Sequence, residues 1–390
     1  MKPFAQIVEE SRSAPAHSLT NPEVSRYSRQ LVLPEVGSTG QDKIKAAKVL
    51  VVGAGGLGSS ALLYLAAAGV GQIGVMDGDV VEVSNLHRQV IHRSSREGQN
   101  KAESAKLSML ELNPLITVVA YPVRIDQANS QDIVPVYDLI VDGTDNVTSR
   151  YFLSDLAVHY KKPLVFGAAL RWEGHVSLFN YNGGPCYRCI FPQAPPIELQ
   201  CNCSDAGVIG LVPGIIGQLQ AVETLKVLLG IPSLSGKLLV YDALESSFRK
   251  VTMRGKDEAC PACAAVTTID PHTYDYAAFL APKAPTKSHE DLLAELPEVN
   301  KVTAEAYRTV TSTQKHLYEE HLLVDVRLPL HFSIVHLPNA VNVPLGELER
   351  YVEELRQTAL EKSVFLFCRR GVSACKATHF LLSKGITSEK

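Results

Sequence analysis

Apolar and polar positions along this 390-residue chain form blocks of two lengths. Continuous apolar runs of strand length alternate with longer segments of helical length, and Gly, Asn, Asp and Pro separate them. The blocks lie at 48–52, 59–68, 72–76, 101–113, 138–142, 147–160, 163–168, 175–180 and 214–230. Buried strands that alternate with helices are typical of a doubly wound α/β sheet, so we predict that fold, continuing into a strand-rich half.

A second pattern of the same kind begins towards the C-terminal end. One predicted strand, at 322–327, ends in charged residues. Another, at 364–367, is followed by a cysteine and then by a predicted helix. The stretch before them combines several prolines with charges, which indicates an interdomain linker. We therefore expect a flexible tail at 1–22, a first α/β domain at 23–269 with a cysteine loop at about 191–212, a linker at 270–298 and a smaller α/β domain at 299–390.

Composition narrows the class of protein. Hydrophobic residues make up 46% and charged residues 20% of the chain, which is ordinary for a soluble globular protein with a sizeable core. A net charge of -3 gives no reason to expect direct nucleic-acid binding or a membrane surface, and glycines break the longest apolar stretches. We expect a cytoplasmic protein. In that compartment, metal ligands or nucleophiles are a better interpretation of its eight cysteines than disulfides.

A glycine-rich turn at 53–58 follows the first buried strand and opens a helix. Glycines let the backbone approach an anion, and the free N–H groups at the start of a helix hold negative charge, so this turn predicts a phosphate site. Asp77 ends the next strand, where a ribose-binding acid belongs. On these features alone, a nicotinamide dinucleotide fits as well as ATP.

Charged residues downstream favour ATP. Asn85, Arg88 and Gln89 lie about one helical turn apart, so Asn85 can share a face with the other two. Arg88 and Lys101 together can neutralise a triphosphate, whereas a dinucleotide would need only the glycine turn. Asp145 follows a buried strand, where open α/β sheets bind ligands, and a carboxylate beside phosphates is a natural Mg²⁺ ligand. The alternatives are surface charges for the two cations and a helix N-cap for Asp145.

Four cysteines form two C-x2-C pairs, Cys186 with Cys189 and Cys260 with Cys263. Four thiolates complete the tetrahedral shell of a structural zinc ion. The pairs lie far apart in sequence, so the spacing alone does not show that they meet, but neither has the strand-to-helix context of a thioredoxin-like redox pair. We predict one structural Zn²⁺ per protomer.

The irregular, Pro-rich loop after the first pair holds two further cysteines. Cys203 can approach the start of the helix at 214–230, whose dipole favours a thiolate, and this position suits a nucleophile. Cys201 is its competitor, and two idle thiols remain the alternative.

Cys368 is a second candidate nucleophile. It ends a strand and precedes a helix, and Arg369 and Arg370 add positive potential, so we expect a thiol that is largely thiolate at neutral pH. A cysteine phosphatase would carry arginine at the position where Ala374 stands. Cys375, farther into the helix, is better explained by core packing.

The motifs of residues 23–268 together resemble the MoeB/ThiF branch of the ubiquitin-activating-type enzymes. They are Gly53-Ala-Gly-Gly-Leu-Gly58, Asp77-Gly-Asp79, Ser84-Asn-Leu-His-Arg-Gln89, Lys101, Asp142-Gly-Thr-Asp-Asn146, both C-x2-C pairs and Asn202-Cys203-Ser-Asp-Ala-Gly-Val-Ile-Gly210. The resemblance implies a Rossmann-like ATP-binding domain with structural zinc, magnesium at Asp145, a thioester at Cys203 and a homodimer in which Arg29 reaches the partner's ATP. It places the ATP contacts at Gly56, Asp77, Ser84, Asn85, Leu86, His87, Arg88, Gln89, Lys101, Asp145 and Asn146.

The residues from about 299 onwards resemble a rhodanese sulfurtransferase domain. The motifs are Leu322-Leu-Val-Asp-Val-Arg327, His336-Leu-Pro-Asn-Ala-Val-Asn-Val-Pro344 and Val364-Phe-Leu-Phe-Cys-Arg-Arg-Gly-Val-Ser373. The resemblance implies that Cys368 carries a persulfide. Rhodanese domains usually continue past the point that corresponds to Lys390, so we expect the last helix to be missing or displaced.

Together, the two halves resemble a family of eukaryotic fused adenylyltransferases and sulfurtransferases. The resemblance implies ATP-dependent adenylation of the C-terminal glycine of a ubiquitin-like sulfur carrier ending in Gly-Gly, followed by thiocarboxylate formation. It also implies that this product serves tRNA wobble-uridine 2-thiolation, protein conjugation and molybdopterin synthesis. The implied partners are this carrier, an upstream persulfide donor (a cysteine desulfurase or sulfurtransferase) and a second copy of the chain. The alternatives are a non-catalytic scaffold for a ubiquitin-like protein and an NAD-dependent oxidoreductase.

Overall fold

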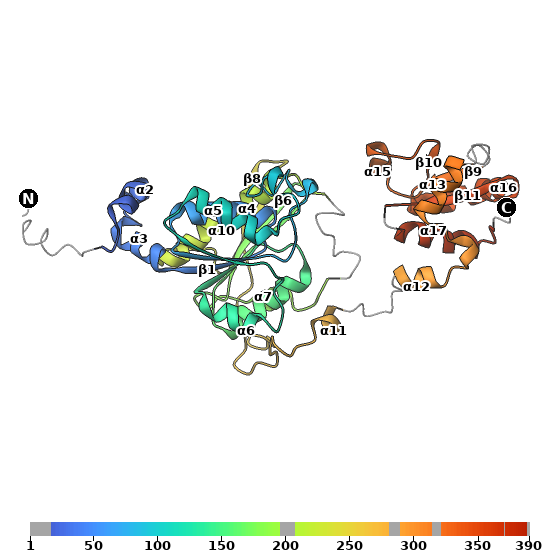
Figure 1. Cartoon of the computed structure of the whole chain (residues 1–390). Coiled ribbons are helices and arrows are strands. Elements are labelled where there is room, and N and C mark those ends of the chain that lie inside the picture. Colours follow the sequence, from blue (N-terminus) through green and yellow to red (C-terminus); the bar gives the residue numbers. More distant parts are fainter. Residues whose placement is uncertain (1–16, 196–206, 281–288, 314–320, 370, 388–390) are drawn as a thin grey trace, which may run out of the picture. The chain divides into compact units, whose positions relative to one another are not determined.

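The computed structural model describes residues 17–195, 207–280, 289–313, 321–369 and 371–387. The chain divides into two compact units, Met1–Ala281 and Pro282–Lys390, each described here by itself (Figure 1). Both are α/β units, and the first is built on a doubly wound sheet, so the predicted fold class is confirmed. No helix among the described residues is both long enough and apolar enough to cross a membrane.

Eight strands of the described residues form the sheet of the first unit, in the order β3-β2-β1-β4-β5-β6-β7-β8. Strands β1 to β5 run parallel, and the pairings from β5 to β8 are antiparallel. The bounds are β1 Lys48–Val52, β2 Gln72–Met76, β3 Thr117–Tyr121, β4 Leu139–Asp142, β5 Leu164–Leu170, β6 Glu173–Phe179, β7 Lys237–Asp242 and β8 Ser247–Thr252.

Helices cover both faces of this sheet, as the continuous apolar strands require (Figure 1). Successive side chains of β1 point to opposite faces: Val49 and Val51 pack with α4, α5 and α10, whereas Leu50 and Val52 pack with α7. The helices are α2 Asn21–Leu31, α3 Gly37–Ala46, α4 Gly56–Ala68, α5 Lys101–Leu112, α6 Ser130–Ile133, α7 Val147–His159, α8 Tyr187–Ile190, α10 Leu211–Leu229 and α11 Tyr276–Leu280.

The segment just after the second cysteine pair packs against the first unit. Gln127 Nε2 donates hydrogen bonds to the carbonyl oxygens of Pro271, at 3.0 Å, and Tyr274, at 2.9 Å. The Tyr276 hydroxyl donates to Asp155 on α7, at 2.8 Å. The first residues of the stretch that we expect to be a linker are therefore held to α7 and its surroundings.

The second unit has a three-stranded parallel sheet in the order β10-β9-β11. Its core lies between this sheet and helices α16 and α17, and includes Val324, Leu355, Ala377 and Leu381. The bounds are α12 His289–Ala294, α13 Ala304–Thr313, β9 His321–Asp325, α15 Pro329–Ile334, β10 Ala340–Asn342, α16 Val352–Glu361, β11 Ser363–Phe367 and α17 Val372–Ser383.

Candidate functional site

The sheet of the first unit reverses its strand order between β1 and β4, where open α/β sheets form a crevice. The glycine turn follows β1 and residues 143–146 follow β4, so the two segments lie side by side. Gly53 has φ +100°, and a Cβ there would lie 2.6 Å from the Gly143 carbonyl oxygen. A Cβ on Gly58 would lie 1.9 Å from the Gly53 carbonyl oxygen. Both positions therefore require glycine.

The start of α4 has no side-chain cap. Its N-cap residue is Gly55, whereas the Ala54 N–H before it donates to Asp77 Oδ2 at 2.8 Å. Asp77 Oδ1 accepts from the Asp79 N–H at 2.9 Å, and burial raises the pKa of Asp77. Because the first-turn N–H groups of α4 have no side-chain acceptor, they can hold a phosphate.

The segment after β2 contains buried polar residues. Asn85 Oδ1 accepts from Gln89 Nε2 at 2.9 Å and from Arg88 Nη2 at 3.3 Å, as their spacing predicts. Asn85 is 8% exposed and Gln89 is 3% exposed, so both amide side chains are buried. The bond between the two amides lowers the cost of burying them, and Gln89 Oε1 is left without a partner among the described residues.

The other residues of this motif differ in exposure. Ser84 and His87 are exposed, whereas Leu86 and Arg88 are half-buried. Arg88 Cγ lies 3.6 Å from where a Cβ of Gly56 would be, so the arginine stands beside the first turn of α4. The predicted contacts Gly56 and Arg88 therefore meet at the uncapped helix start.

Lys101 is the first residue of α5 and is buried. The side chain of Asn100 caps the helix by accepting from the Ala102 N–H at 2.8 Å. The Lys101 ammonium lies 3.1 Å from Asp79 Oδ2, which holds it at the carboxyl end of β2. Lys101 is therefore no freely solvated surface charge.

Asp145 is exposed and lies two residues before Val147, the first residue of α7. The N-cap of this helix is Asn146, whose Oδ1 accepts from the Ser149 N–H at 2.8 Å. The capping role considered for Asp145 is thus filled by its neighbour. By contrast Asp142 is fully buried, accepts from the Thr144 hydroxyl at 2.6 Å, and has its pKa raised by burial. Asp145 is the carboxylate of this loop that a cation can reach.

The sequence analysis missed His92, which is 4% exposed. One ring nitrogen lies 3.0 Å from the Ala54 carbonyl oxygen and the other 3.0 Å from the Ser104 hydroxyl on α5. Burial lowers the pKa of His92 to about 4, so the ring is neutral at physiological pH. His92 ties the glycine turn to the helix that begins with Lys101. No local pattern marks such a residue.

The two cysteine pairs meet in space. Sγ atoms of Cys186 and Cys260 lie 3.6 Å apart, and those of Cys189 and Cys263 lie 3.3 Å apart. All four sulfur atoms lie within 4.8 Å of one another, and all four residues are buried. Burial raises the pKa of Cys263 to about 12 and also raises that of Cys186, so four neighbouring thiolates need a cation among them. The donor set fits a tetrahedral Zn²⁺.

A buried ion pair connects this cluster to α7. Arg188, inside the first pair, contacts both carboxylate oxygens of Asp155; Nε lies 2.8 Å from Oδ1 and Nη2 lies 2.8 Å from Oδ2. Its guanidinium also lies 4.4 Å from the ring centroid of Phe279. Burial lowers the pKa of Arg188, but the Asp155 carboxylate outweighs that effect and raises it overall. The cysteine cluster therefore braces the helix that follows Asp145.

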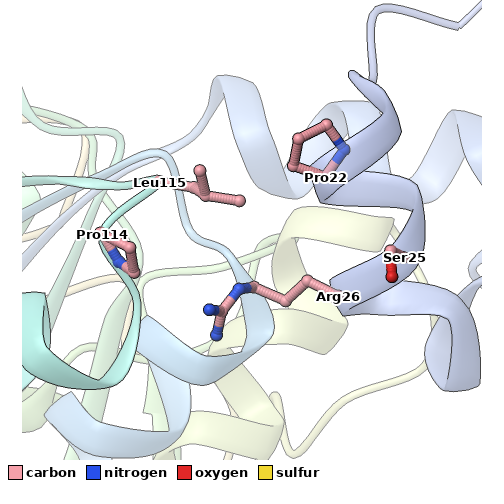
Figure 2. A pocket seen from close by; sticks show the side chains of 5 residues that line it. All are labelled: Pro22, Ser25, Arg26, Pro114 and Leu115. Atoms are coloured by element: carbon pink, nitrogen blue, oxygen red, sulfur yellow. The ribbon is translucent and has the colours of Figure 1, made fainter.

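Arg29 and Arg26 lie on α2, outside the crevice of this chain. Arg26 lines an open cavity of about 550 Å³ with Pro22, Ser25 and the Pro114-Leu115 turn, and points towards that turn (Figure 2). Its Nη1 donates to the Leu112 carbonyl oxygen at 3.0 Å. Arg29 is exposed, and within the described part of the chain its side chain has no ion-pair or hydrogen-bond partner.

Cys203 and Cys201 lie outside the described residues. The chain is described again from Gly207, whose carbonyl oxygen accepts from the Arg171 N–H at 3.0 Å. A Cβ on Gly210 would lie 2.2 Å from the His87 carbonyl oxygen. The end of the cysteine loop is therefore packed against the nucleotide-site motif.

Cys368 is half-buried directly after β11. Its Sγ accepts from the Ala374 N–H in the first turn of α17, at 3.4 Å. Arg369 is exposed, and Arg370 is not among the described residues. Cys375 is 5% exposed, which confirms its assignment to the core.

A doubly wound unit with a glycine turn, and a second unit with a thiol at a helix start, define a nucleotide-binding protein that carries a sulfur-reactive domain. The family model of the ThiF family matches residues 27–262, and that of the rhodanese-like domain matches residues 309–388. The chain belongs to the ThiF family and ends in a rhodanese-like domain.

Curated relatives resemble most of the chain. The adenylyltransferase and sulfurtransferase MOCS3 of Culex quinquefasciatus is 45% identical over 361 residues, which cover 90% of this chain and 81% of the relative. The proteins of the same name from Xenopus laevis and Arabidopsis thaliana are 43% and 41% identical, and the matches cover 80% and 82% of their lengths.

Solved structures resemble the chain in fold. The crystal structure of Escherichia coli MccB superimposes with a TM-score of 0.56 and 22% identity, covering 68% of this chain and 82% of that one. PaaA superimposes with a TM-score of 0.54 and 24% identity, covering 64% of this chain and 80% of that one.

Proposed function

We propose that this protein is an adenylyltransferase and sulfurtransferase for a ubiquitin-like carrier that ends in Gly-Gly. One observation carries the proposal: the chain joins a complete glycine turn with its cations to a Cys368 thiol at a helix start. Relatives at 41% to 45% identity are named for both activities. The pairing fits a substrate that must first be activated and then sulfurated.

The first step is activation of a carboxylate. A C-terminal glycine carboxylate is a poor electrophile, so its oxygen attacks the α-phosphorus of ATP and the bond to pyrophosphate breaks. Arg88 and Lys101 stabilise the negative charge that develops, and the N–H groups of α4 hold phosphate oxygens. Asp77, directly after β2, is the proposed ligand of the ribose hydroxyls.

Asp145 is the proposed Mg²⁺ ligand. The metal, when bound, would neutralise phosphate charge beside this exposed carboxylate. Asn146 holds the start of α7 and so positions the loop that presents Asp145. The remaining ATP contacts are proposed at Ser84, Asn85, Leu86, His87 and Gln89.

The second step is sulfur transfer. The terminal sulfur of a persulfide on Cys368 attacks the adenylated carbonyl, AMP leaves, and an acyl disulfide links the carrier to Cys368. A thiol then attacks the Cys368 sulfur; the carrier departs as a thiocarboxylate and the two cysteines are left as a disulfide. Cys203 is the proposed attacking thiol, and it can alternatively hold the acyl group as a thioester before transfer.

Zinc, dimerisation and partners belong to the same proposal. One Zn²⁺ per protomer would be held by Cys186, Cys189, Cys260 and Cys263 and would fix the fold near α7. Arg29, exposed and unpaired among the described residues, would reach the ATP of the partner in a homodimer. The persulfide would come from a cysteine desulfurase or sulfurtransferase in the cytoplasm, and the product would serve tRNA thiolation, protein conjugation and molybdopterin synthesis.

The test is an incubation of the purified protein with MgATP, a persulfide donor and candidate proteins ending in Gly-Gly. We expect carrier-dependent ATP–pyrophosphate exchange and a carrier whose mass shows one sulfur in place of oxygen. A carrier that binds without ATP consumption would contradict the proposal and favour the scaffold. Saturable NAD binding without exchange would favour the oxidoreductase.

A further inference from the structure

Near the glycine turn, the carboxylate of Asp79 is shared by two cations. One of them, Arg124, is not among the residues of the family motifs. Asp79 makes two ion pairs: Oδ2 lies 3.1 Å from Lys101 Nζ, and Oδ1 lies 2.7 Å from Arg124 Nη2. The lysine side chain is 8% exposed, whereas that of Arg124 is 81% exposed. One acid thus holds a buried ammonium on one oxygen and a surface guanidinium on the other.

Backbone contacts fix the Lys101 half of this arrangement. The Lys101 N–H donates to the Asp79 carbonyl oxygen at 2.9 Å. Asn100 Nδ2, at the start of α5, donates to the carbonyl oxygens of Asp77 at 2.9 Å and Asp79 at 3.2 Å. Asp79 therefore cannot move away from Lys101 without disturbing the start of the helix.

Arg124 reaches Asp79 from the loop that follows β3. A Cβ on Gly78 would lie 2.7 Å from Arg124 Cγ and 2.9 Å from its backbone nitrogen, so this loop packs directly against the Asp77–Asp79 turn. The hydrogen bond to Asp79 raises the pKa of Arg124, and the carboxylates of Asp77 and Asp145 add to the effect. The guanidinium thus faces carboxylates of the turns that follow both β2 and β4.

The arrangement decides how much of the lysine charge is available. An ammonium held by a carboxylate is largely neutralised and is a weak ligand for phosphate. A second cation on the same carboxylate competes for its charge and weakens its hold on the first. Without Arg124, both oxygens of Asp79 could turn to Lys101.

We propose that Arg124 is a positioning residue for the nucleotide: by binding Asp79, it leaves the Lys101 ammonium available to the triphosphate. The inference rests on the proposed use of ATP. Arg124 then acts through Asp79 and needs no contact with phosphate.

The test compares MgATP binding by calorimetry with carrier-dependent ATP–pyrophosphate exchange. We expect Arg124→Gln to raise both the Kd and the KM for ATP about three- to fivefold, as the loss of an exposed charge pair does, while kcat stays within about twofold. Arg124→Lys should recover most of the affinity. The matched control is Arg350→Gln in the second unit, which removes a similarly exposed arginine from its ion pair with Glu347 and should change neither constant.

A double-mutant cycle separates positioning from direct binding. In an Asp79→Asn background, Arg124→Gln should have no further effect on the ATP Kd, because the shared carboxylate is gone. An unchanged Kd in the Arg124→Gln single variant, or an equal loss in both backgrounds, would overturn the inference. The binding measurement needs no turnover, so wild-type protein that binds MgATP without exchange would contradict the proposed function and leave this test intact. Absence of MgATP binding by the wild type would overturn both.

Discussion

Each unit of the molecule contains a strand, a tight turn and a helix, but the two turns present different chemistry. After β1, the turn consists of glycine and alanine, and no side chain caps α4. After β11, the turn begins with Cys368, whose sulfur accepts the Ala374 N–H of α17. The same helix start is thus open to a phosphate in one unit and occupied by a thiol in the other. The residues that follow the strand therefore differ in chemistry: in one unit they leave the helix N–H groups free for an anion, and in the other they present a nucleophile.

The surroundings of the two turns differ as well. The buried His92 and the half-buried Asp77 hold the glycine turn in place, and the Arg188–Asp155 pair holds α7 beside it. Cys368 is half-buried, and its recorded hydrogen bond is the one to α17. A phosphate site depends on exact backbone positions, whereas a thiol that exchanges sulfur with other proteins must be accessible.

The largest expected effect comes from a variant that removes the activity of the Cys368 turn and leaves that of the glycine turn unchanged. Cys368→Ala should abolish thiocarboxylate formation while carrier-dependent ATP–pyrophosphate exchange stays at the wild-type rate, because activation needs no thiol. Mass spectrometry of the carrier and an exchange assay measure the two outcomes. The control is Cys375→Ala, at a buried position of α17, the helix that follows Cys368; it should retain sulfur transfer wherever the unit stays folded. Loss of exchange in Cys368→Ala would contradict this division of labour.

The next effect concerns the nucleotide turn alone. Asp145→Ala should lower the exchange rate by about a thousandfold, because a charge-stabilising group at the phosphates is lost. Asp132→Ala removes an exposed acid from α6 and should leave the rate unchanged. An unaffected rate in Asp145→Ala would remove this residue from the proposed magnesium site.

The third effect tests the brace beside that turn. Arg188→Met leaves Asp155 buried without its cation and should lower the free energy of unfolding by about 3 kcal/mol. Urea unfolding can be followed by fluorescence of Trp172, the single tryptophan of the chain, which reports on the first unit. Removing both charges in Arg188→Met with Asp155→Leu should recover part of the loss. Lys301→Met, from an exposed pair with Glu298, is the control. Equal unfolding free energies of Arg188→Met and the wild type would show that the ion pair does not stabilise the fold.

The smallest expected effect is a dependence of the unfolding free energy on pH, caused by His92 beside the glycine turn. The pKa of His92 is about 4 in the folded protein and about 6.5 when unfolded, so the unfolded chain binds the extra proton first as pH falls. This histidine contributes stability above pH 6.5 that is lost as pH falls towards 4. Between pH 7 and 5 the loss should be about 2 kcal/mol.

The comparison is with a variant in which residue 92 no longer titrates. In His92→Gln, the unfolding free energy measured through Trp172 should decline less steeply between pH 7 and 5. His331→Gln, on an exposed part of α15, should keep the wild-type slope. The same slope in His92→Gln and the wild type would show that His92 does not titrate as its burial indicates.

The amino-acid sequence by itself determined the local parts of this protein. The apolar runs located β1, β2 and β4 to within a residue, because buried parallel strands need continuous apolar side chains. The glycine turn, the two C-x2-C pairs and Cys368 were found for a similar reason: their chemistry depends on neighbours in the sequence. The three-residue strand β10 and the antiparallel strands β7 and β8, at one end of the large sheet, carried weaker patterns and were not located.

Only the tertiary structure decided which of these parts meet. It brought together cysteine pairs some 70 residues apart, placed Asn146 rather than Asp145 at the helix cap, and buried Asn85 and Gln89. It also joined Arg124 to Asp79 across two strand ends. Such contacts join residues distant in sequence, and their energy depends on burial and on exact atomic positions. Periodicity and spacing describe only residues that are close along the chain, so they contain no information on burial or on the exact positions of atoms from distant segments.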